Sequence, residues 1–444
     1  MAGVAEVKPH LEVKLRLGVP APDAPYWEDA IHDKAGTDSI IDRELARLLA
    51  RYAVPVLATR AYSPHGTTWS QDEIAAGLDR VYRLVLLENR EVPPQLLRDV
   101  TLIPTIEYAR LGAVGRTPLP QPEVAALSVT TDRRSREAIF LDEAQQYSLG
   151  DPTVVIAVLD TGVWTNHPEF KGRMLPGRDF VDILDGADQF LGDYLDADED
   201  PTDAVGHGTH VTGILVARGQ GMPLGVAPKC RILPVRVLGA LRQGEKRVGA
   251  GLVDNINVAI KWAIDQGATI INMSLGVRHT GGGLPHQDVI DYAKRKGVTV
   301  VAAAGNDGQE QLYYPGALPH VIAVGAVDER GDVAPYSTYG RQVSFVAPGT
   351  NIYSTYLDNE YAHSTGTSHA TPFVTGGVAL LRSYAKTKHG IKLSDARIKH
   401  VLKHSADRID GQFKHPKAGF GHINLLDAMK LLEHKLSTRL DKAA

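Results

Sequence analysis

The sequence predicts an α/β fold, in which a doubly wound and mostly parallel sheet carries helices on both faces, preceded by a small N-terminal α+β unit. Two features predict the sheet. Short runs rich in β-branched residues alternate with segments of helical periodicity, and these runs are apolar at nearly every position, as strands buried on both faces are. The length of 444 residues leaves room for the second, smaller unit.

The predicted elements of the large unit alternate between strands and helices. Its predicted strands are Val154–Leu159, Arg231–Leu238, Thr269–Met273, Val298–Ala303, Val321–Val324 and Ser344–Val346. Its predicted helices are His207–Val216, Leu252–Gln266, Asp288–Lys296 and Ser368–Tyr384. Because parallel strands need long crossover connections, this alternation favours a parallel sheet.

The first part of the chain shows a different pattern. Segments with helical or strand spacing are Ile40–Leu49, Gln71–Arg80, Val81–Leu87, Pro94–Val100 and Ile106–Leu111. The proline-rich stretch Thr117–Pro122 and the charged stretch Asp132–Arg136 then indicate an exposed linker. The sequence therefore predicts an N-terminal unit over residues 1–116, a linker over 117–137, the large unit over 138–435 and a tail over 436–444.

Composition and charge argue against two classes of partner. The net charge is −4, and no basic tract is long enough to follow a phosphate backbone or an anionic membrane. The segment Met1–Pro22 lacks the apolar core of a secretory signal. Cys230 is the single cysteine, so the chain can form no intramolecular disulfide. We therefore expect no nucleic-acid or membrane partner. We also expect a protein that is cytoplasmic or is exported by a route that uses no N-terminal signal peptide.

Reactive residue types stand at the ends of predicted elements. Asp160 follows the first strand of the sheet, His207 begins a helix, and Ser368 stands at the start of another. Catalytic groups collect at the carboxyl ends of strands in open α/β sheets, and a hydroxyl at a helix start can be activated by a neighbouring base. Asn306, between His207 and Ser368 in the chain, could donate to a developing oxyanion. The order Asp, His, Asn, Ser is that of a known catalytic triad with its oxyanion donor.

In this order the motifs resemble the subtilase family of serine peptidases (peptidase S8), over about residues 138 to 432. The matching segments are Val158–Val163, His207–Val211, Gly225–Pro228, Ile271–Gly276, Ala304–Asn306 and Gly366–Ser368. The resemblance implies a subtilisin-like serine endopeptidase that needs no cofactor for catalysis.

The resemblance also implies a role for each matching residue. Asp160 would orient the imidazole of His207, which would move the proton. Ser368 would attack the scissile carbonyl, and Asn306 with the Ser368 N–H would bind the oxyanion. The segment Ser274, Leu275 and Gly276 would form one wall of a cleft in which an extended protein or peptide substrate pairs as an added strand.

Two positions depart from the family pattern. His369 follows the nucleophile, where the family usually has Met. A second catalytic base is one interpretation, but adjacent helix positions do not face each other, so we expect a residue that lines the cleft and removes an oxidisable thioether. Tyr313 stands where a small residue commonly precedes Tyr-Pro at the base of the substrate pocket. We therefore expect a shallow pocket that disfavours large aromatic side chains before the cut.

An acidic run before His207 has the side chains that hard cations prefer, namely Asp193, Asp196, Asp198, Asp200 and Thr202. A helix–loop–helix calcium loop is excluded, because Pro201 stands where that loop requires glycine. Some subtilases bind Ca²⁺ just before the catalytic His, so a structural calcium site and a solvated acidic loop are both open. The family's other common calcium loop is replaced by residues 217–222, where Arg218 brings the wrong charge.

The N-terminal unit is a candidate partner within the chain. Residues Val81–Leu111 loosely resemble the inhibitory propeptide of subtilases, in which a helix leads into a strand and the sheet packs on the protease. The protein would then be a zymogen whose linker lies in the cleft until it is cut between about Arg116 and Ser135. A permanent accessory domain is the alternative, and a separate regulator is left open.

Other function classes fit less well. An α/β-hydrolase needs Gly-x-Ser-x-Gly, which Ala370 breaks, and the chain order Ser, Asp, His. The His-Glu-x-x-His motif of metallopeptidases does not occur. A non-catalytic binding module built on an inactive protease fold is the alternative from another class.

Overall fold

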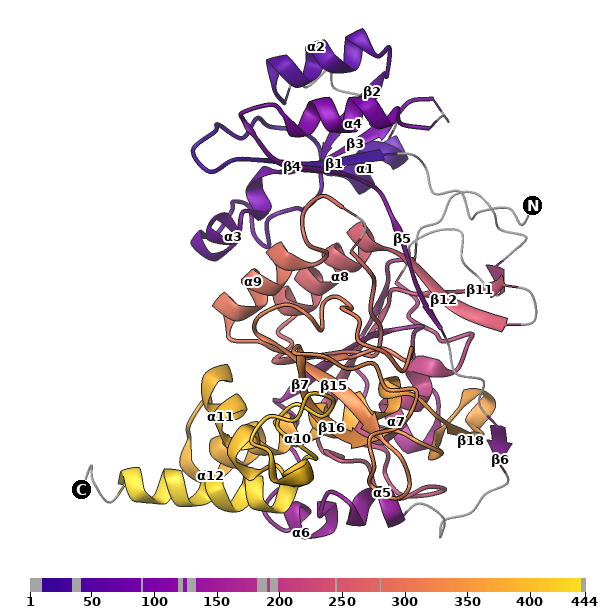
Figure 1. Cartoon of the computed structure of the whole chain (residues 1–444), viewed down its shortest axis with the longest axis vertical. Helices are drawn as coiled ribbons and strands as arrows, with labels where there is room; N and C mark the ends of the chain where they lie inside the picture. The colour runs from indigo at the N-terminus through magenta and orange to yellow at the C-terminus, as the bar shows by residue number, and fades with distance from the viewer. Residues whose placement is uncertain are drawn as a thin grey trace.

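The computed structural model describes residues 10–33, 41–88, 91–118, 123–125, 133–181, 190–191, 199–243, 246–279 and 281–440. In these residues the chain forms an N-terminal unit that sits on one end of a larger α/β unit (Figure 1). None of the helices in the described ranges has the length and apolar character needed to span a membrane.

The larger unit is built on a seven-stranded sheet. Its strand order is β16 (Val343–Pro348), β15 (Val321–Val327), β14 (Thr299–Ala303), β13 (Ile270–Met273), β7 (Val155–Asp160), β10 (Arg231–Arg236) and β8 (Arg178–Asp179), and every neighbouring pair is parallel. Each predicted strand of the sheet is present, with ends that shift by a few residues. The predicted fold class is therefore confirmed.

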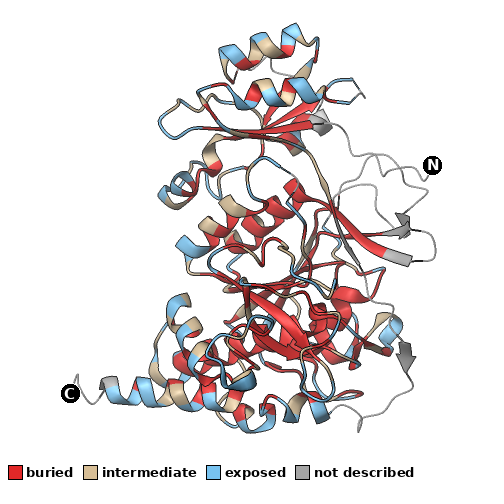
Figure 2. Cartoon of the chain, in the orientation of Figure 1, coloured by how far each residue is buried: buried red, intermediate tan, exposed pale blue. Residues whose placement is uncertain are grey.

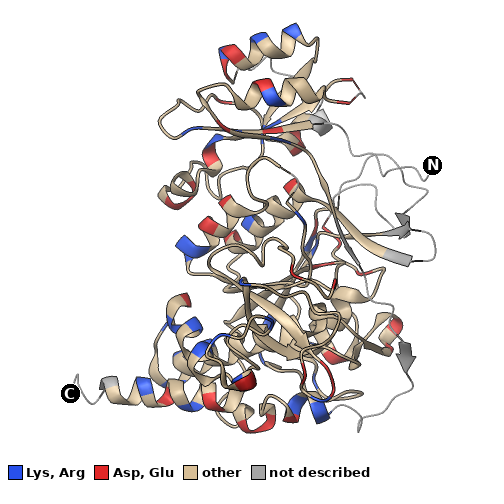
Figure 3. Cartoon of the chain, viewed as in Figure 1, with Lys and Arg blue, Asp and Glu red and all other residues tan. Residues whose placement is uncertain are grey.

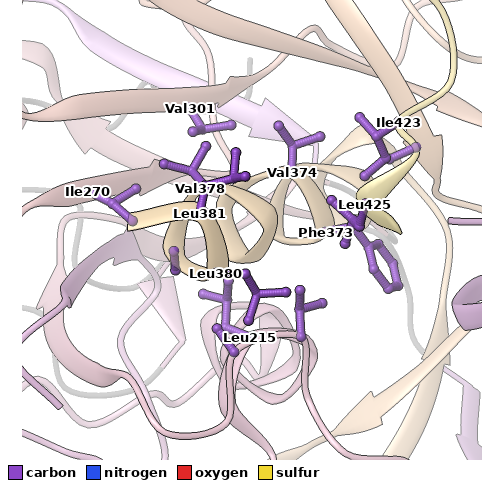
Figure 4. Close-up of a cluster of buried hydrophobic side chains, with 14 of the residues drawn as sticks. Leu215, Ile270, Val301, Phe373, Val374, Val378, Leu380, Leu381, Ile423 and Leu425 are labelled. Atoms are coloured by element: carbon purple, nitrogen blue, oxygen red, sulfur yellow. The ribbon is translucent and has the colours of Figure 1, made fainter. Parts of the chain in front are cut away.

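Helices cover both faces of this sheet. On β7, Ile156 and Val158 face one apolar cluster, while Ala157 and Leu159 face the other. The first cluster is shared with α6 (Leu141–Gln145), α7 (His207–Val216), α10 (Thr367–His389), α11 (Asp395–Ser405) and α12 (Leu425–Leu440). The second is shared with α8 (Val253–Asp265) and α9 (Gln287–Lys296). Figure 4 shows the first cluster, where α10 lies between the sheet residues Ile270 and Val301 and Leu215 of α7.

The N-terminal unit has a four-stranded antiparallel sheet in the order β2 (Val56–Arg60), β3 (Val81–Leu86), β1 (His10–Leu15) and β4 (Ile106–Leu111). Its helices are α1 (Trp27–Asp33), α2 (Arg43–Arg51), α3 (Gln71–Ala76) and α4 (Pro94–Thr101). Leu11, Val13 and Leu15 of β1 pack in a core with α2 and α4. The central strand β1 was not among the predicted elements.

The other face of the N-terminal sheet lies on α8 and α9, and this junction combines charged contacts with apolar ones, among them Leu78 and Val81. Arg110 of β4 contacts both Glu12 of β1 (2.5 Å) and Asp254 of α8 (3.1 Å). His10 Nε2 also lies 2.7 Å from Asp254. Lys14 donates to Asp288 of α9 at 2.7 Å. Both sides of the junction are buried (Figure 2), and charged residues gather along it (Figure 3).

The connection between the units is more ordered than the predicted exposed linker. Strand β5 (Val114–Pro118) pairs antiparallel with β12 (Lys246–Leu252), which forms a sheet with β11 (Gly239–Gln243) and β9 (Phe190–Leu191). Further on, β6 (Glu123–Ala125) pairs with β18 (Tyr361–Ser364), which also pairs with β17 (Ile352–Thr355). Helix α5 (Arg133–Glu137) follows. The rest of the predicted linker, 119–122 and 126–132, lies outside the described residues.

Candidate active site

Asp160 and His207 meet at the carboxyl edge of the large sheet. Asp160 is the last residue of β7, an inner strand between β13 and β10, and His207 is the first residue of α7. Asp160 Oδ1 lies 2.6 Å from Nδ1 of His207, and both side chains are buried. This contact holds the ring in the tautomer that leaves Nε2 free to accept a proton.

A second buried carboxylate, Asp203, supports this pair. Its Oδ1 accepts hydrogen bonds from the Thr161 hydroxyl (2.9 Å) and from the backbone N–H of Gly206 (2.9 Å). Its Oδ2 accepts from the hydroxyl (2.7 Å) and the N–H (2.9 Å) of Thr209. Asp203 therefore ties the residue after Asp160 to the first turn of α7, where a negative charge is favourable. Asp203 was not among the predicted site residues, although its position four residues before His207 was a signal.

The surroundings of His207 favour its charged form. Burial is the largest influence and lowers its pKa, but the charge and hydrogen bond of Asp160 and the charge of Asp203 outweigh it. The pKa of His207 is therefore raised above the usual value of about 6.5. Because a general base must be neutral to accept a proton, activity that depends on His207 should rise with pH through this raised pKa.

Ser368 lies in the first turn of α10 and is 3% exposed. Its hydroxyl donates to the carbonyl oxygen of Ser274 at 3.1 Å, and the Ser274 hydroxyl donates back to the Ser368 carbonyl at 2.8 Å. Within the described part of the chain, Nε2 of His207 is buried and has no hydrogen-bond partner. The hydroxyl of Ser368 must therefore turn from Ser274 to His207 to be activated. Catalytic hydrogen bonds are often loose before substrate binds.

Asn306 lies in the loop after β14, and the start of α10 orients it. Its Oδ1 accepts from the backbone N–H of Thr367 at 2.8 Å and from the Thr367 hydroxyl at 2.9 Å. These two donors fix the oxygen side of the amide, so Nδ2 is the atom that can donate to a substrate. Since Thr367 precedes Ser368, the amide is held beside the serine, where an oxyanion donor has to be.

His369 is fully buried, not at the surface of the cleft as predicted. Its ring centroid lies 5.5 Å from that of His207 and 4.5 Å from that of His210. Burial, followed by the nearby His210 and His207, lowers its pKa well below the usual value, so the ring stays neutral. The residue therefore packs behind the catalytic pair, and its burial agrees with the expectation that it is not a second base.

The predicted substrate-binding segment follows β13. Ser274 contacts Ser368 as described, and Gly276 adjoins Tyr313. The side chain of Leu275 is 2% exposed and belongs to the apolar cluster under α8, so only its main chain can face a substrate. Tyr313 is half-buried, and its hydroxyl donates to Asp307 at 2.6 Å.

The predicted calcium ligands are only partly described. Asp193, Asp196 and Asp198 lie outside the described residues, and Asp200 accepts a hydrogen bond from the backbone N–H of Thr202 at 3.0 Å. In the described part of the chain no cluster of three acidic, His or Cys side chains is arranged to hold a metal ion.

The loop that replaces the second family calcium site contacts the buried carboxylate of Glu169. Glu169 Oε1 accepts from the backbone N–H of Gln220 (2.8 Å) and of Gly221 (2.6 Å), and from the hydroxyl of Tyr361 (3.1 Å).

Comparisons with known proteins agree with this geometry. The family model described as "Subtilase family" matches residues 151–422. The "Thermophilic serine proteinase" of Bacillus sp. (strain AK1) is 39% identical over 65% of this chain and 65% of its own length, just under two thirds. "Thermitase" of Thermoactinomyces vulgaris is 39% identical over 58% of this chain and 82% of its own length.

A solved structure supports the same assignment. The prenylagaramide maturation protease PagA is 30% identical, with a TM-score of 0.53, over 66% of this chain and 98% of that one. The matched residues of the family model include Asp160, His207, Asn306 and Ser368 in their chain order. The chain belongs to the subtilase family of serine proteases.

Proposed function

We propose that this protein is an endopeptidase that hydrolyses peptide bonds of extended protein substrates through an acyl-enzyme on Ser368. The observation that carries the proposal is the buried 2.6 Å contact between Asp160 Oδ1 and His207 Nδ1, which leaves the other ring nitrogen of His207 free as a base among the described residues. Asp160 orients the ring and stabilises the imidazolium that forms.

The reaction follows from these positions. Nε2 of His207 takes the hydroxyl proton as Ser368 Oγ bonds to the scissile carbonyl carbon, and the carbonyl oxygen becomes an oxyanion. The N–H of Ser368 and the amide of Asn306 donate to that oxygen, and one such donor is typically worth about 3–4 kcal/mol of barrier. The C–N bond then breaks as His207 returns the proton to the leaving amine. Water, deprotonated by His207, hydrolyses the ester.

Strand β5 supports an extended mode of substrate binding. It lies antiparallel on β12, with Gly115 opposite Gly251 and Arg116 opposite Ala250. A side chain at Gly115 would meet Val277, just after the segment Ser274–Gly276. A chain segment can therefore lie between β12 and that segment as an added strand, and a substrate would use the same main-chain hydrogen bonds.

The same pairing supports restraint by the N-terminal unit. Strand β5 occupies the strand position that a substrate would need, and the N-terminal sheet anchors it through its contacts with α8 and α9. We therefore propose that the chain is a zymogen whose N-terminal unit and linker act as an intramolecular inhibitor until the linker is cut. A permanent N-terminal domain is the alternative.

Labelling with a fluorophosphonate tests both proposals. The full chain, Ser368→Ala and a chain cut in the linker would be labelled and examined by intact mass and peptide mapping. Label on Ser368 together with a released N-terminal fragment would support a self-maturing protease, whereas label without release would favour the permanent domain. Absence of label from both the full and the cut chain would overturn the peptidase proposal in favour of a binding module.

Structural calcium remains a prediction from the acidic run before His207. If the loop binds Ca²⁺, adding the ion should raise the melting temperature of the full chain, and EDTA should reverse the change, because a ligand of the native state stabilises it by mass action. Replacing Asp196 and Asp198 with Asn should abolish the response. An unchanged melting temperature at millimolar Ca²⁺ would leave a solvated acidic loop.

A further inference from the structure

A side chain of the protein itself lies between two backbone segments beside Ser368. Two segments flank this serine: 274–276, through the hydrogen bonds of Ser274, and 304–306, through the bond from Thr367 to Asn306. A substrate residue whose carbonyl carbon is attacked by Ser368, and whose oxygen is held by Asn306, must lie against both. Its side chain therefore extends into the space between them.

Tyr313 occupies this space. A Cβ atom added to Gly276 would lie 3.0 Å from Cβ of Tyr313, and one added to Gly305 would lie 2.6 Å from its Cδ2. Both distances are shorter than ordinary van der Waals contact, so the ring fits only because both walls carry glycine. The backbone also holds it, since the N–H of Val277 donates to the Tyr314 carbonyl at 2.9 Å and the N–H of Tyr314 donates back at 2.8 Å.

Two charged residues clamp the phenol group. Tyr313 donates its hydroxyl proton to Asp307 Oδ2 (2.6 Å), and Arg278 Nη2 donates to the same oxygen (2.7 Å). Arg278 Nε donates to the phenol oxygen at 3.1 Å. Arg278 follows one wall of the pocket and Asp307 follows the other, so this clamp of Arg278, Tyr313 and Asp307 joins the two walls.

The clamp keeps the ring as a neutral donor. Burial, followed by the hydrogen bond to Asp307, raises the pKa of the Tyr313 hydroxyl. The guanidinium of Arg278 also lies 5.5 Å from the centre of the ring, within range of a cation–π contact. Packing of the ring and hydrogen bonds of the hydroxyl therefore hold Tyr313 in the same orientation.

We propose that Tyr313 determines the substrate class of this enzyme by filling the pocket for the residue before the cut, and that Arg278 and Asp307 lock it there. The inference rests on the proposed peptidase function. It restricts cleavage to sites after small residues such as Gly, Ala and Ser. A substrate phenyl ring could enter only if Tyr313 left the pocket and broke the three hydrogen bonds of the clamp.

The test compares kcat/KM for a peptide series that differs only in Ala, Leu or Phe before the cut. The full chain would be used after self-processing, or after a limited cut by immobilised trypsin at the exposed Arg133 and Arg134. Wild type should prefer Ala to Phe by at least about 100-fold, since even small misfits in an apolar pocket cost about 10–200-fold. Tyr313→Gly should raise the ratio of cleavage after Phe to cleavage after Ala by a similar factor.

Further variants separate the effect of the Tyr313 ring on specificity from the effect of the clamp. Tyr313→Phe keeps the ring but loses the phenol bonds, so cleavage after Phe should rise less than in Tyr313→Gly. Arg278→Ala should act like Tyr313→Phe. Lys399→Ala, which breaks a surface ion pair with Asp395 on α11, should leave the preference unchanged.

Fluorophosphonate labelling of Ser368 in each variant distinguishes the two possible failures. Absence of label on Ser368 in the processed wild-type chain would reject the peptidase function itself. With Ser368 labelled, efficient wild-type cleavage after Phe, or no gain for Phe in Tyr313→Gly, would overturn the role of Tyr313. Failure of both proteins to cut any peptide of the series would also overturn it.

Discussion

Helices α8 and α10 cover opposite faces of the same sheet, and both are almost completely buried, but by different means. Around α10 most of the buried contacts are apolar, with Val374, Val378 and Leu381 packed between the sheet, α7 and the C-terminal helices (Figure 4). On α8, Asp254 and Asn255 are buried against charged side chains of the N-terminal sheet.

The difference indicates which partner can leave. Exposing an apolar face to water costs about 25 cal/mol of free energy per Å² and promotes aggregation. Charged groups, in contrast, are hydrated again when the two units separate. The charged part of the junction at α8 therefore has the chemistry of a separable contact, although apolar residues such as Leu78 and Val81 also pack there, and the core around α10 has the chemistry of a permanent one. This contrast is independent support for a removable N-terminal unit.

The largest expected effect on the association of the two units comes from a change at Arg110. Arg110→Ala leaves Glu12 and Asp254 buried together without their shared cation, which should cost about 4 kcal/mol of binding between the units, or about a thousandfold in affinity. Titration calorimetry of the separated units would measure it. Arg98→Ala, exposed on the outer helix α4, is the matched control and should change nothing. Equal effects of the two variants would contradict the proposed role of the junction.

A change in the core around α10 should lower the stability of the fold and should not affect the association of the two units. Leu381→Ala removes a side chain that is 1% exposed in the core around α10 and should lower the free energy of unfolding by about 3 kcal/mol, from lost burial and the cavity left behind. Urea unfolding with the N-terminal unit present or removed would give the same loss. A loss that appears only with the N-terminal unit bound would contradict the contrast. Leu102→Ala, at a 78% exposed site, provides the baseline.

The junction should also respond to pH through Glu12. Arg110 cannot neutralise both carboxylates, and Asp254, next to His10 as well, keeps the lower pKa. Burial, despite the opposing charge of Arg110, raises the pKa of Glu12 to about 8, and Tyr108 donates to it at 2.9 Å. Because the bound form holds a proton that the separated form releases, binding should weaken as pH rises.

The expected loss is about tenfold in affinity between pH 7 and pH 9, measured by the same calorimetry. Glu12→Gln keeps the shape and removes the titration, so its affinity should change much less over this range. An equally steep dependence in that variant would assign the effect to another group.

The smallest expected effect concerns His369, one of the buried polar residues of α10. His369 has no hydrogen-bond partner in the described part of the chain and packs behind His207. His369→Met should keep kcat/KM within about tenfold, since His369 is not a base, but should lose activity faster in peroxide, because a thioether oxidises to the sulfoxide. Residual activity against time would measure it. Equally rapid inactivation of wild type would refute the expectation.

The sequence predicted the large sheet well because its strands are apolar on both faces. It predicted α7 as His207–Val216, the same bounds as in the structure, since the helix begins at a motif. It missed β1, where His10, Glu12 and Lys14 alternate with Leu11, Val13 and Leu15. Polar residues are normally exposed, so their burial in a junction between units cannot be seen in the chain itself.

Site geometry followed a similar rule. The motifs predicted Asp160, His207, Asn306 and Ser368, because each stands at or shortly after the boundary of an element. They did not indicate that Asp203 ties the loop after β7 to α7, since this depends on contacts between distant segments. The clamp on Tyr313 was also hidden, because Arg278 and Asp307 lie in separate loops.

If the N-terminal unit is the proposed inhibitor, the covalent connection that runs through β5 and β6, paired with β12 and β18, sets its local concentration at the site. While the connection is intact, the N-terminal unit faces its site at an effective concentration in the millimolar range. A single cut converts this to the concentration of free fragment in solution, which dilution or proteolysis can reduce almost without limit. Activation would then be governed by mass action as well as by the cut, and a dilute enzyme would stay active where a concentrated one is still inhibited.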